Sequence, residues 1–397
     1  MEKTNTNRAI KKVVVLGAGV MGAGIALHFA GVGCEVLLLD MVPNDLKEEE
    51  KNNPKSRNRI VNELFAFALK SKPSPLYTST VAKRVKLGNF DDDMPKIKDC
   101  DWIIEVVVER LDIKKIIYEK VEKYRRPGTL VTSNTSGIPI HLMAEGRSED
   151  FQKNFAGTHF FNPPRYLRLL EIIPTPYTDQ SVIDFLMEFG DKILGKETVL
   201  CKDTPAFIAN RVGVYSMAKV FQLATELGLK IEEVDKLTGP VIGRPKTGTF
   251  KLSDLVGNDT GTKVMMGIKD SCPNDEQAET FNIPAYVDFL LENKFFGNKT
   301  KKGYYEKTKG ADGKTVINAL RLDTLTYEPV GKVKFPSLEE ANQKEKLADK
   351  IRTFLKHDDK GAQLVKRSLA GLFAYVSNRV PEISDNLYSV DDALRAG

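Results

Sequence analysis

Short apolar runs separated by helical patterns occupy the first half of the chain. Val13-Val-Val-Leu-Gly17 is apolar and rich in β-branched residues, and Glu35 to Asp40 forms a second run of the same kind. The residues between them, through about Phe29, have the character of a buried helix. A parallel strand covered on both faces has a continuous apolar run rather than an alternating one. This order of strand, helix and strand predicts the opening of a doubly wound, mostly parallel α/β sheet.

The strand pattern continues to about residue 203, with one polar interruption. Further strand-like runs begin at Val85, Trp102, Thr129, Phe155, Leu169 and Thr198. From about 47 to 86 the chain is polar and lysine-rich, but it contains an amphipathic stretch from Arg59 to Leu69. We predict a helical arm inserted between two strands, and inserted arms commonly carry function. The first domain is therefore expected to span residues 11–203.

Beyond Asp203-Thr-Pro205 the pattern becomes helical, which predicts an all-α second domain over residues 204–310. The segment Ile231-Glu-Glu-Val-Asp-Lys-Leu-Thr-Gly239 is faintly echoed near the end of the chain, at Leu387-Tyr-Ser-Val-Asp-Asp-Ala-Leu-Arg-Ala-Gly397. We interpret residues 311–397 as a partial second copy of the helical unit. The abrupt end of the pattern at Gly397 further suggests a fragment of a longer polypeptide.

Composition and charge narrow the classes of function. Of 397 residues, 41% are hydrophobic and 28% are charged, which is typical of a globular protein. The net charge of +5 is too small to indicate a nucleic-acid partner, and no stripe of aromatic and basic residues is present. The uncharged segment from Val13 to Gly33 is too rich in glycine for a lipid-facing helix, so we expect no membrane span.

The four cysteines lie far apart in the sequence and form no CxxC pair. They are Cys34, Cys100, Cys201 and Cys272. A zinc site or a disulfide framework is therefore not expected, and we predict no metal. This use of cysteine fits a reducing compartment, so the predicted location is cytoplasmic.

The turn after the first strand predicts a dinucleotide site. Gly17-Ala-Gly-Val-Met-Gly22 matches G-x-G-x-x-G between a predicted strand and a predicted helix, which is the context of a Rossmann-type domain. Gly17 permits the tight turn, Gly19 lets the backbone approach a pyrophosphate, and Gly22 allows close packing of helix and strand. Asp40 ends the second strand, where its carboxylate favours the ribose hydroxyls of NAD over the 2′-phosphate of NADP. FAD and a glycine-rich turn that binds nothing are the alternatives.

The oxidation of an alcohol needs a base, and histidine is the natural choice near neutral pH. His159 is the candidate among the four histidines because it ends a strand at the edge where open α/β sheets bind ligands. Glu171 lies in the otherwise apolar run Leu169 to Ile173, where an unpaired carboxylate would be costly. Pairing of Glu171 with His159 would remove that cost. A purely structural ion pair is the alternative.

Four segments closely resemble the L-3-hydroxyacyl-CoA dehydrogenase family, and the resemblance extends over about residues 11 to 310. They are Val15-Leu-Gly-Ala-Gly-Val-Met-Gly22, Ser133-Asn-Thr-Ser136, Gly157-Thr-His-Phe-Phe-Asn-Pro-Pro164 and Pro205-Ala-Phe-Ile-Ala-Asn-Arg211. The resemblance implies that His159 is the catalytic base and Glu171 its orienting partner. For the remaining site it implies substrate contacts by Ser136 and Asn210, cofactor contacts by Glu109 and Lys114, and polar roles for Asn134 and Asn162.

The implied reaction is reversible transfer of a hydride from the C3-hydroxyl of an (S)-3-hydroxyacyl-CoA to NAD, giving a 3-oxoacyl-CoA in fatty-acid β-oxidation. The doubled helical unit resembles the multifunctional members, in which the dehydrogenase is fused to an enoyl-CoA hydratase, although no hydratase-like segment occurs in this sequence. A homodimer through the helical domain is also expected.

Three questions stay open at this point. The phosphates of coenzyme A find candidate partners in Lys55, Arg57, Lys70 and Lys72 on the arm, and also in Arg244 and Lys246. Another Rossmann-type 3-hydroxyacid or sugar-phosphate dehydrogenase is a rival interpretation. So is a non-catalytic dinucleotide-binding protein.

Overall fold

The computed structural model describes residues 8–310 and 313–397, which divide into two compact units. The first unit comprises the chain up to Ala209 together with Val380–Gly397, and the second comprises Asn210–Arg379. The last helix of the chain therefore belongs to the same unit as the first strand. Each unit is described separately below.

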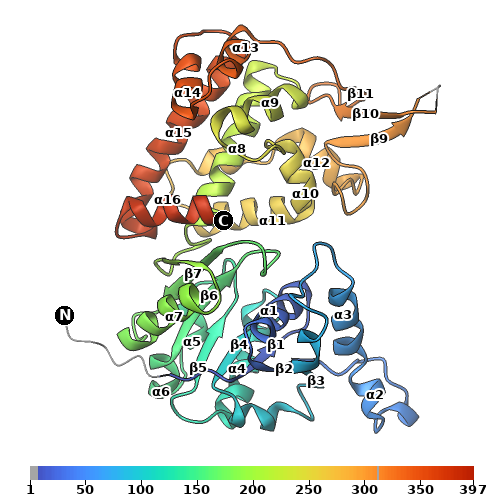
Figure 1. The fold of residues 1–397 in the computed structure, drawn as a ribbon, viewed down its shortest axis with the longest axis vertical. Coiled ribbons are helices and arrows are strands. Elements are labelled where there is room, and N and C mark those ends of the chain that lie inside the picture. Colours follow the sequence, from blue (N-terminus) through green and yellow to red (C-terminus); the bar gives the residue numbers. More distant parts are fainter. Residues whose placement is uncertain (1–7, 311–312) are drawn as a thin grey trace. The chain divides into compact units, whose positions relative to one another are not determined.

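The first unit is built on an eight-stranded sheet with the order β3-β2-β1-β4-β5-β6-β7-β8 (Figure 1). The strands are β1 Lys12–Leu16, β2 Glu35–Asp40, β3 Val85–Asn89, β4 Trp102–Glu105, β5 Leu130–Ser133, β6 Phe155–Phe160, β7 Leu169–Pro174 and β8 Glu197–Leu200. All neighbours pair in parallel except β6 and β7, which are antiparallel. The predicted doubly wound, mostly parallel sheet is thus confirmed.

Helices cover this sheet and form the arm. They are α1 Val20–Gly31, α2 Pro54–Arg57, α3 Arg59–Leu69, α4 Leu111–Tyr124, α5 Ile140–Ala144, α6 Glu149–Lys153, α7 Gln180–Lys192 and α16 Leu387–Ala396. The helical arm lies between β2 and β3, as the sequence predicted, and contains α2 and α3. Helix α3 buries Val61, Phe65 and Ala68 and packs against α1. Its amphipathic pattern therefore reflects a docked arm with one face in solvent.

An aromatic cluster fills the core beside α1 and α7. Trp102 of β4 packs edge-on against Phe29 and Phe189, with ring centroids 5.1 and 5.6 Å apart. The indole N–H of Trp102 donates to Oγ1 of Thr132 at 2.9 Å, so the one polar atom of this side chain stays paired. Complete burial of such side chains stabilises the fold by about 1.5–3 kcal/mol each. The carboxyl ends of the central strands are therefore held on a rigid base.

The second unit is mainly helical. Its elements are α8 Ala209–Leu227, which begins one residue before the boundary, α9 Ile231–Leu237, α10 Phe250–Val256, α11 Asn258–Ser271, α12 Ala285–Glu292, α13 Pro336–Asn342, α14 Leu347–Leu355 and α15 Lys360–Ile383, which crosses into the first unit. Tyr215 of α8 stacks on Tyr375 of α15 with ring centroids 3.8 Å apart and planes 3° apart. Arg211, also on α8, donates to the hydroxyl of Tyr375 at 2.6 Å. Helix α15, which lies in the predicted second copy of the helical unit, thus packs directly on α8.

A small antiparallel sheet in the second unit was not predicted from the sequence. It has the order β11-β10-β9, with β9 Tyr305–Lys309, β10 Thr315–Leu320 and β11 Tyr327–Pro329. Most of its side chains are exposed or half-buried. A strand that faces water on both sides has no apolar run, so the hydrophobic pattern that revealed the first sheet is missing here.

Within residues 8–310 and 313–397, none of the helices combines the length and the apolarity that crossing a bilayer requires.

Candidate active site

The glycine-rich turn lies at the point where the strand order of the sheet reverses, between β1 and β4. Gly17 has φ +106°, and a Cβ atom there would lie 2.5 Å from the carbonyl oxygen of Val106, which follows β4. A Cβ at Gly22 would lie only 1.8 Å from the carbonyl oxygen of Gly17. At Gly19 a Cβ would meet no protein atom within 4 Å. Gly17 and Gly22 therefore shape the turn, whereas Gly19 leaves its backbone open to a ligand.

The start of helix α1 has free N–H groups. Its N-cap residue, Gly19, offers no capping side chain, and no acidic residue occurs in the first turn. A helix N-terminus of this kind carries a partial positive charge that suits a phosphate. Asp40, at the end of the neighbouring strand β2, accepts from the backbone N–H of Ala18 at 2.6 Å. The carboxylate that we assign to ribose recognition is thereby tied to the glycine-rich turn itself.

His159 and Glu171 face each other across the only antiparallel pair of this sheet. They are directly opposed in the register of β6 and β7, although twelve positions separate them in the sequence. Opposed residues of an antiparallel pair lie on the same face of the sheet. The Nδ1 atom of His159 lies 2.7 Å from Oε2 of Glu171, and both side chains are buried.

The hydrogen bond determines which tautomer His159 adopts. A carboxylate can only accept, so Nδ1 of the imidazole carries the proton that it donates to Glu171. The lone pair of a neutral imidazole is then on Nε2. Among the described residues, no protein group forms a hydrogen bond with Nε2. The ring is flanked by Phe161, at a centroid distance of 4.4 Å, and by Phe207, at 5.7 Å. His159 thus presents a base in a largely apolar setting.

The second oxygen of Glu171 is held by the backbone before and at the start of α8. Oε1 accepts from the N–H groups of Ile208 at 3.1 Å and Ala209 at 2.7 Å. The two preceding residues, Ala206 and Phe207, have φ values of +63° and +50°. Such left-handed conformations are unfavourable for non-glycine residues, by about 1–3 kcal/mol each. With Ala206 and Phe207 in these conformations, the N–H groups of Ile208 and Ala209 point at Glu171.

A second polar cluster surrounds Glu109, in the loop after β4. Oε1 of Glu109 accepts from the backbone N–H of Ser136 at 2.9 Å and from Oγ1 of Thr135 at 2.5 Å. Its Oε2 lies 3.4 Å from Nζ of Lys114, whose side chain is buried. Burial opposes ionisation of Glu109, but the charge of Lys114 and these hydrogen bonds outweigh it and hold the pKa of Glu109 below its ordinary value.

Asn134 connects the two clusters. It directly follows β5, and its side-chain oxygen accepts from the backbone N–H of Phe160 at 2.9 Å. Phe160 is the neighbour of His159 in β6. The loop that carries Ser136 is therefore anchored beside the histidine. Asn210, the other residue implied in substrate contact, is the second residue of α8 and the first of the second unit.

Comparison with known proteins identifies the family. The model of the 3-hydroxyacyl-CoA dehydrogenase NAD binding domain matches residues 12–204, and the model of the C-terminal domain of the same family matches residues 207–307. The chain belongs to the 3-hydroxyacyl-CoA dehydrogenase family. It is 43% identical over 300 residues to a probable 3-hydroxyacyl-CoA dehydrogenase of Deinococcus radiodurans, covering 76% of this chain and 84% of that protein.

A longer relative matches nearly the whole chain. The probable 3-hydroxyacyl-CoA dehydrogenase of Bacillus subtilis (strain 168) is 43% identical over 397 residues, which is 98% of this chain and 50% of that protein. The chain thus spans about half the length of this relative. Among solved structures, that of Mycobacterium tuberculosis FadB2 aligns with a TM-score of 0.61 at 27% identity, covering 76% of this chain and all of that one.

NAD is the cofactor of a 3-hydroxyacyl-CoA dehydrogenase N-terminal domain, and the residues of this chain fit it. The open backbone at Gly19, the uncapped start of α1 and the carboxylate of Asp40 are the groups that would hold the pyrophosphate and the ribose. Among residues 8–310 and 313–397, no group of three or more His, Cys, Asp or Glu side chains is arranged to hold a metal ion.

Sequence reasoning overlooked a buried network around Glu105. Glu105 ends β4 and is fully buried. It accepts from Nζ of Lys114 at 2.8 Å, from the hydroxyl of Tyr118 at 2.8 Å and from Oγ of Ser133 at 2.6 Å. A buried charge pair is tolerated only with such complete hydrogen bonding. A carboxylate in an apolar strand was the signal that singled out Glu171, and it was present at Glu105 as well.

The four arm residues proposed for coenzyme A have different surroundings. Arg57 donates to Asp92 through Nε at 2.7 Å and Nη2 at 2.9 Å, and Lys55 is exposed on α2. Lys70 is exposed at the end of α3. Lys72 lines a cavity of about 230 Å³, to which Asn162 also contributes. Of the four arm residues, Lys72 alone lines the cavity to which Asn162 contributes.

Cys201 is a further neighbour of the histidine–glutamate pair that sequence reasoning did not assign to the site. Burial and then the charge of Glu171 raise the pKa of the Cys201 thiol well above its ordinary value. The thiol therefore stays protonated and unreactive beside Glu171. It fills space next to the carboxylate without adding a second negative charge.

Substitution of Gly22 and of Gly19 is expected to have different effects on the free energy of unfolding and on NADH binding. Gly22→Ala should lower the free energy of unfolding by ~1–3 kcal/mol and remove measurable NADH binding, because the new Cβ collides with backbone. Gly19→Ala should keep the free energy of unfolding within about 1 kcal/mol of wild type and still weaken NADH binding. Urea unfolding and NADH titration measure the two effects. Equal NADH affinity of Gly19→Ala and wild type would contradict this role of the turn.

Lys196 holds the loop between β6 and β7 and introduces a pH dependence of stability. Its ammonium donates to the carbonyl oxygens of Pro164 and of Leu167, the latter at 2.7 Å. Burial lowers the pKa of Lys196 to about 8, from an ordinary value of 10.5. Between these two pH values the unfolded chain binds more protons than the folded chain, so stability rises with pH.

We therefore expect the difference in unfolding free energy between wild type and Lys196→Met to grow in favour of wild type as the pH rises from about 8. Urea unfolding at a series of pH values measures it. Lys83→Met, at an exposed position, is the control and should show no such trend. A flat difference for Lys196→Met would contradict the assignment.

Proposed function

We propose that the chain catalyses reversible oxidation of the 3-hydroxyl of an (S)-3-hydroxyacyl-CoA to the ketone in fatty-acid β-oxidation, with NAD as the cofactor. The observation that carries this proposal is the buried pair of His159 and Glu171 at 2.7 Å, with Nε2 of the histidine left available. A protein that only binds a dinucleotide has no use for such a pair. It stands at the carboxyl edge of the sheet, where α/β proteins bind their ligands.

In the proposed mechanism His159 and Glu171 act through the hydrogen bond between them. Nε2 of His159 accepts the proton of the 3-hydroxyl, and the imidazolium so formed is stabilised by Glu171. Oε1 of Glu171 is occupied by the amides of Ile208 and Ala209, which leaves Oε2 for His159. Bound NAD supplies the hydride acceptor. Ser136 hydrogen-bonds the substrate oxygen, and Asn210 completes the substrate contacts.

Glu109 and Lys114 are proposed to border the nicotinamide side of the cofactor. The buried ammonium of Lys114 lies between the carboxylates of Glu105, at 2.8 Å, and Glu109, at 3.4 Å. Two negative charges therefore hold one positive charge at this position, and the loop with Ser136 is bound to the same group through Glu109. This arrangement keeps the loop fixed when a substrate enters.

An acyl-CoA assay tests the proposed function. Acetoacetyl-CoA and NADH are mixed with the protein, and oxidation of NADH is followed by the nicotinamide absorbance. We expect turnover with acetoacetyl-CoA and none with acetoacetate or sugar phosphates. Turnover with the free acids instead would favour a different dehydrogenase. NADH binding without turnover of any of these substrates would favour a non-catalytic dinucleotide-binding protein.

The arm is proposed to bind the phosphates of coenzyme A chiefly through Lys70 and Lys72. We expect Lys70→Gln/Lys72→Gln to raise KM for acetoacetyl-CoA by about ten-fold, with a smaller dependence of KM on salt, because exposed lysines recognise phosphates by charge. Lys55→Gln is the control, since this lysine lies on α2 away from the cavity, and should change KM by less than about two-fold. An unchanged KM in the double variant at several salt concentrations would exclude the arm as the anion site.

Two further proposals concern the state of the protein. A homodimer formed through the second unit is tested by light scattering coupled to size-exclusion chromatography. A cytoplasmic location rests on the spacing of the four cysteines, all of which are free thiols in the structure.

A further inference from the structure

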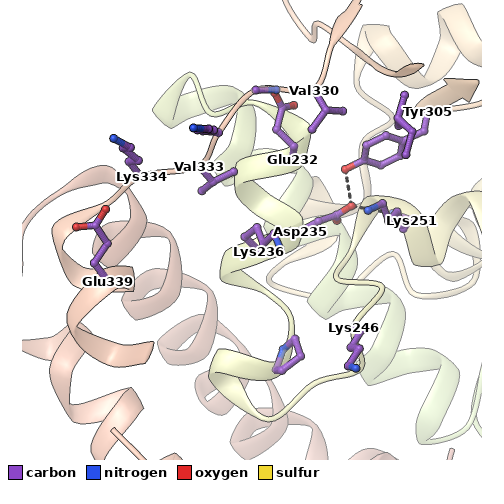
Figure 2. Close-up of a pocket in the computed structure, with 14 residues that line it drawn as sticks. Glu232, Asp235, Lys236, Lys246, Lys251, Tyr305, Val330, Val333, Lys334 and Glu339 are labelled. Atoms are coloured by element: carbon purple, nitrogen blue, oxygen red, sulfur yellow. Dashed lines mark hydrogen bonds between the residues drawn. The ribbon is translucent and has the colours of Figure 1, made fainter. Parts of the chain in front are cut away.

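The second unit contains a cavity of about 710 Å³ that is lined by none of the residues proposed for catalysis (Figure 2). Its walls come from α9, from α10 and the loop before it, from β9 and β10, and from α13 and the segment between β11 and α13. The lining residues are Glu232, Asp235, Lys236, Pro240, Lys246, Lys251, Tyr305, Ile317, Val330, Gly331, Lys332, Val333, Lys334 and Glu339. We refer to it as the lysine cavity. Its volume is in the range of sites that bind small molecules.

Positive charge dominates the rim of the lysine cavity. Five lysines line it, all of them exposed: Lys236, Lys246, Lys251, Lys332 and Lys334. Within the described residues, none of these ammonium groups has a carboxylate at ion-pairing distance. One of the five, Lys246, lies in the basic turn that the sequence had already marked as a candidate anion site.

The acidic side chains of the lysine cavity do not neutralise this rim. Glu232 is engaged by Arg321, whose Nη1 lies 2.9 Å from Oε2. Asp235 accepts from the hydroxyl of Tyr305 at 2.7 Å and from the backbone N–H of Phe250 at 2.6 Å. Burial also raises the pKa of Asp235 to about 6, which reduces its charge at mildly acidic pH. Glu339 alone among the acids is exposed, at the end of the cavity next to Lys334 (Figure 2).

An apolar wall lies between the lysines. Ile317 of β10 and Val330 are 44% and 40% exposed, and both line the cavity. Val333 and Pro240 line the same cavity. A ligand that covered these side chains would remove apolar surface from water, which favours binding. A purely inorganic anion would leave this wall uncovered.

The walls are preorganised by hydrogen bonds. Asp235 joins α9 to the start of α10 and, through the hydroxyl of Tyr305, to β9 (Figure 2). Glu232 accepts from the backbone N–H of Gly331 at 3.3 Å, which ties the segment after β11 to α9. The walls of the cavity are therefore formed before any ligand binds, and the ordering cost of binding falls mainly on the lysine side chains.

We propose that the lysine cavity binds an organic diphosphate, with the phosphates on Lys236, Lys332 and Lys334 and a planar or apolar group against Ile317 and Val330. An adenosine diphosphate group has this chemistry, and it occurs both in free nucleotides and at the nucleotide end of coenzyme A. The site is separate from the glycine-rich turn, which belongs to the first unit. Its lining includes none of the residues proposed for the transfer of hydride and proton.

Binding of ADP to the full chain tests the proposal. Isothermal titration with ADP is carried out without NADH, because NADH itself carries an adenosine diphosphate group. The same titration of Gly22→Ala, in which the dinucleotide site of the first unit is expected to be lost, identifies the ADP that binds in the lysine cavity. The test variant is Lys236→Gln/Lys332→Gln/Lys334→Gln. The matched control, Lys263→Gln/Lys294→Gln/Lys356→Gln, removes the same charge from exposed positions of the same unit outside the cavity.

We expect the test variant to bind ADP at least ten-fold more weakly than wild type and the control to bind within two-fold of it. Ile317→Glu, which keeps all five lysines but places a carboxylate on the apolar wall, should also weaken ADP binding at least ten-fold. Circular dichroism and thermal unfolding establish that each variant is folded.

Further titrations identify the source of the diphosphate. Competition of coenzyme A with ADP, lost in the test variant but kept in Lys70→Gln/Lys72→Gln, would assign the site to the nucleotide end of coenzyme A. ADP binding without such competition would assign it to a free nucleotide. Inorganic pyrophosphate that binds as tightly as ADP would overturn the role of the apolar wall. No ADP binding at millimolar concentration, or equal weakening in the test and control variants, would overturn the site.

Discussion

His159→Gln is expected to lower kcat for acetoacetyl-CoA reduction by ~10²–10⁴-fold, the usual contribution of a positioned acid or base. Glutamine has about the size of histidine and retains a hydrogen bond to Glu171, but its amide cannot exchange a proton with the substrate oxygen near neutral pH. The proposed dinucleotide contacts come from Gly19, α1 and Asp40, none of which is altered in this variant. NADH affinity is therefore expected to stay within about two-fold of wild type.

Steady-state kinetics and NADH titration measure these two quantities. His357→Gln is the matched control, because it makes the same change at a partly exposed histidine that pairs with Glu340 in the second unit. It should leave kcat unaltered. If His159→Gln turned over at the wild-type rate, the histidine would have no part in the reaction, whatever the activity of the protein.

Glu171→Gln is expected to reduce kcat by about 10²–10⁴-fold through the tautomer of the histidine. The amide oxygen of the glutamine would accept from Ile208 and Ala209, so its NH₂ group would face Nδ1 of His159. Nδ1 must then act as an acceptor, and the ring proton moves to Nε2. A protonated Nε2 in the neutral imidazole cannot take the proton of the hydroxyl.

This effect is distinct from a loss of folding. Glutamine keeps the two backbone hydrogen bonds and the volume of the side chain, so the thermal midpoint is expected to fall by only a few degrees. Glu197→Gln, in β8 of the same sheet, provides the control and should keep full activity. If Glu171→Gln kept kcat while lowering stability, the pair would be a structural one.

Prediction from the sequence succeeded where the signal was local. The turn from Gly17 to Gly22 was identified because its glycines, the preceding strand and the following helix are contiguous in the chain. The arm was identified in the same way, from the amphipathic run of α3. The sheet from β9 to β11 was missed, because strands with mostly exposed side chains lack the apolar run on which such a prediction depends.

A contact between residues far apart in the sequence could be predicted only where burial of an unpaired charge would cost free energy. A carboxylate in the apolar strand β7 needs a partner, and this need pointed from Glu171 to His159. The same reasoning applies to Glu105 in β4, but no chemical role called attention to it. For Arg57 the sequence indicated a free cation, whereas the structure shows it held by Asp92 at 2.7 Å. The sequence around a basic residue does not show which acidic residue it pairs with, because surface ion pairs form between residues that are far apart in the chain.

The sequence by itself determined the family, the NAD-binding turn and the alternation of strands and helices, because these depend on short segments whose spacing is part of the chain. Only the tertiary structure decided how the polar groups are used. It placed Nδ1 of His159 against Glu171, buried Lys114 between two carboxylates and gathered five lysines around one cavity. Burial and charge pairing arise when distant segments pack together. The sequence determines these contacts, but no local pattern in it reveals them.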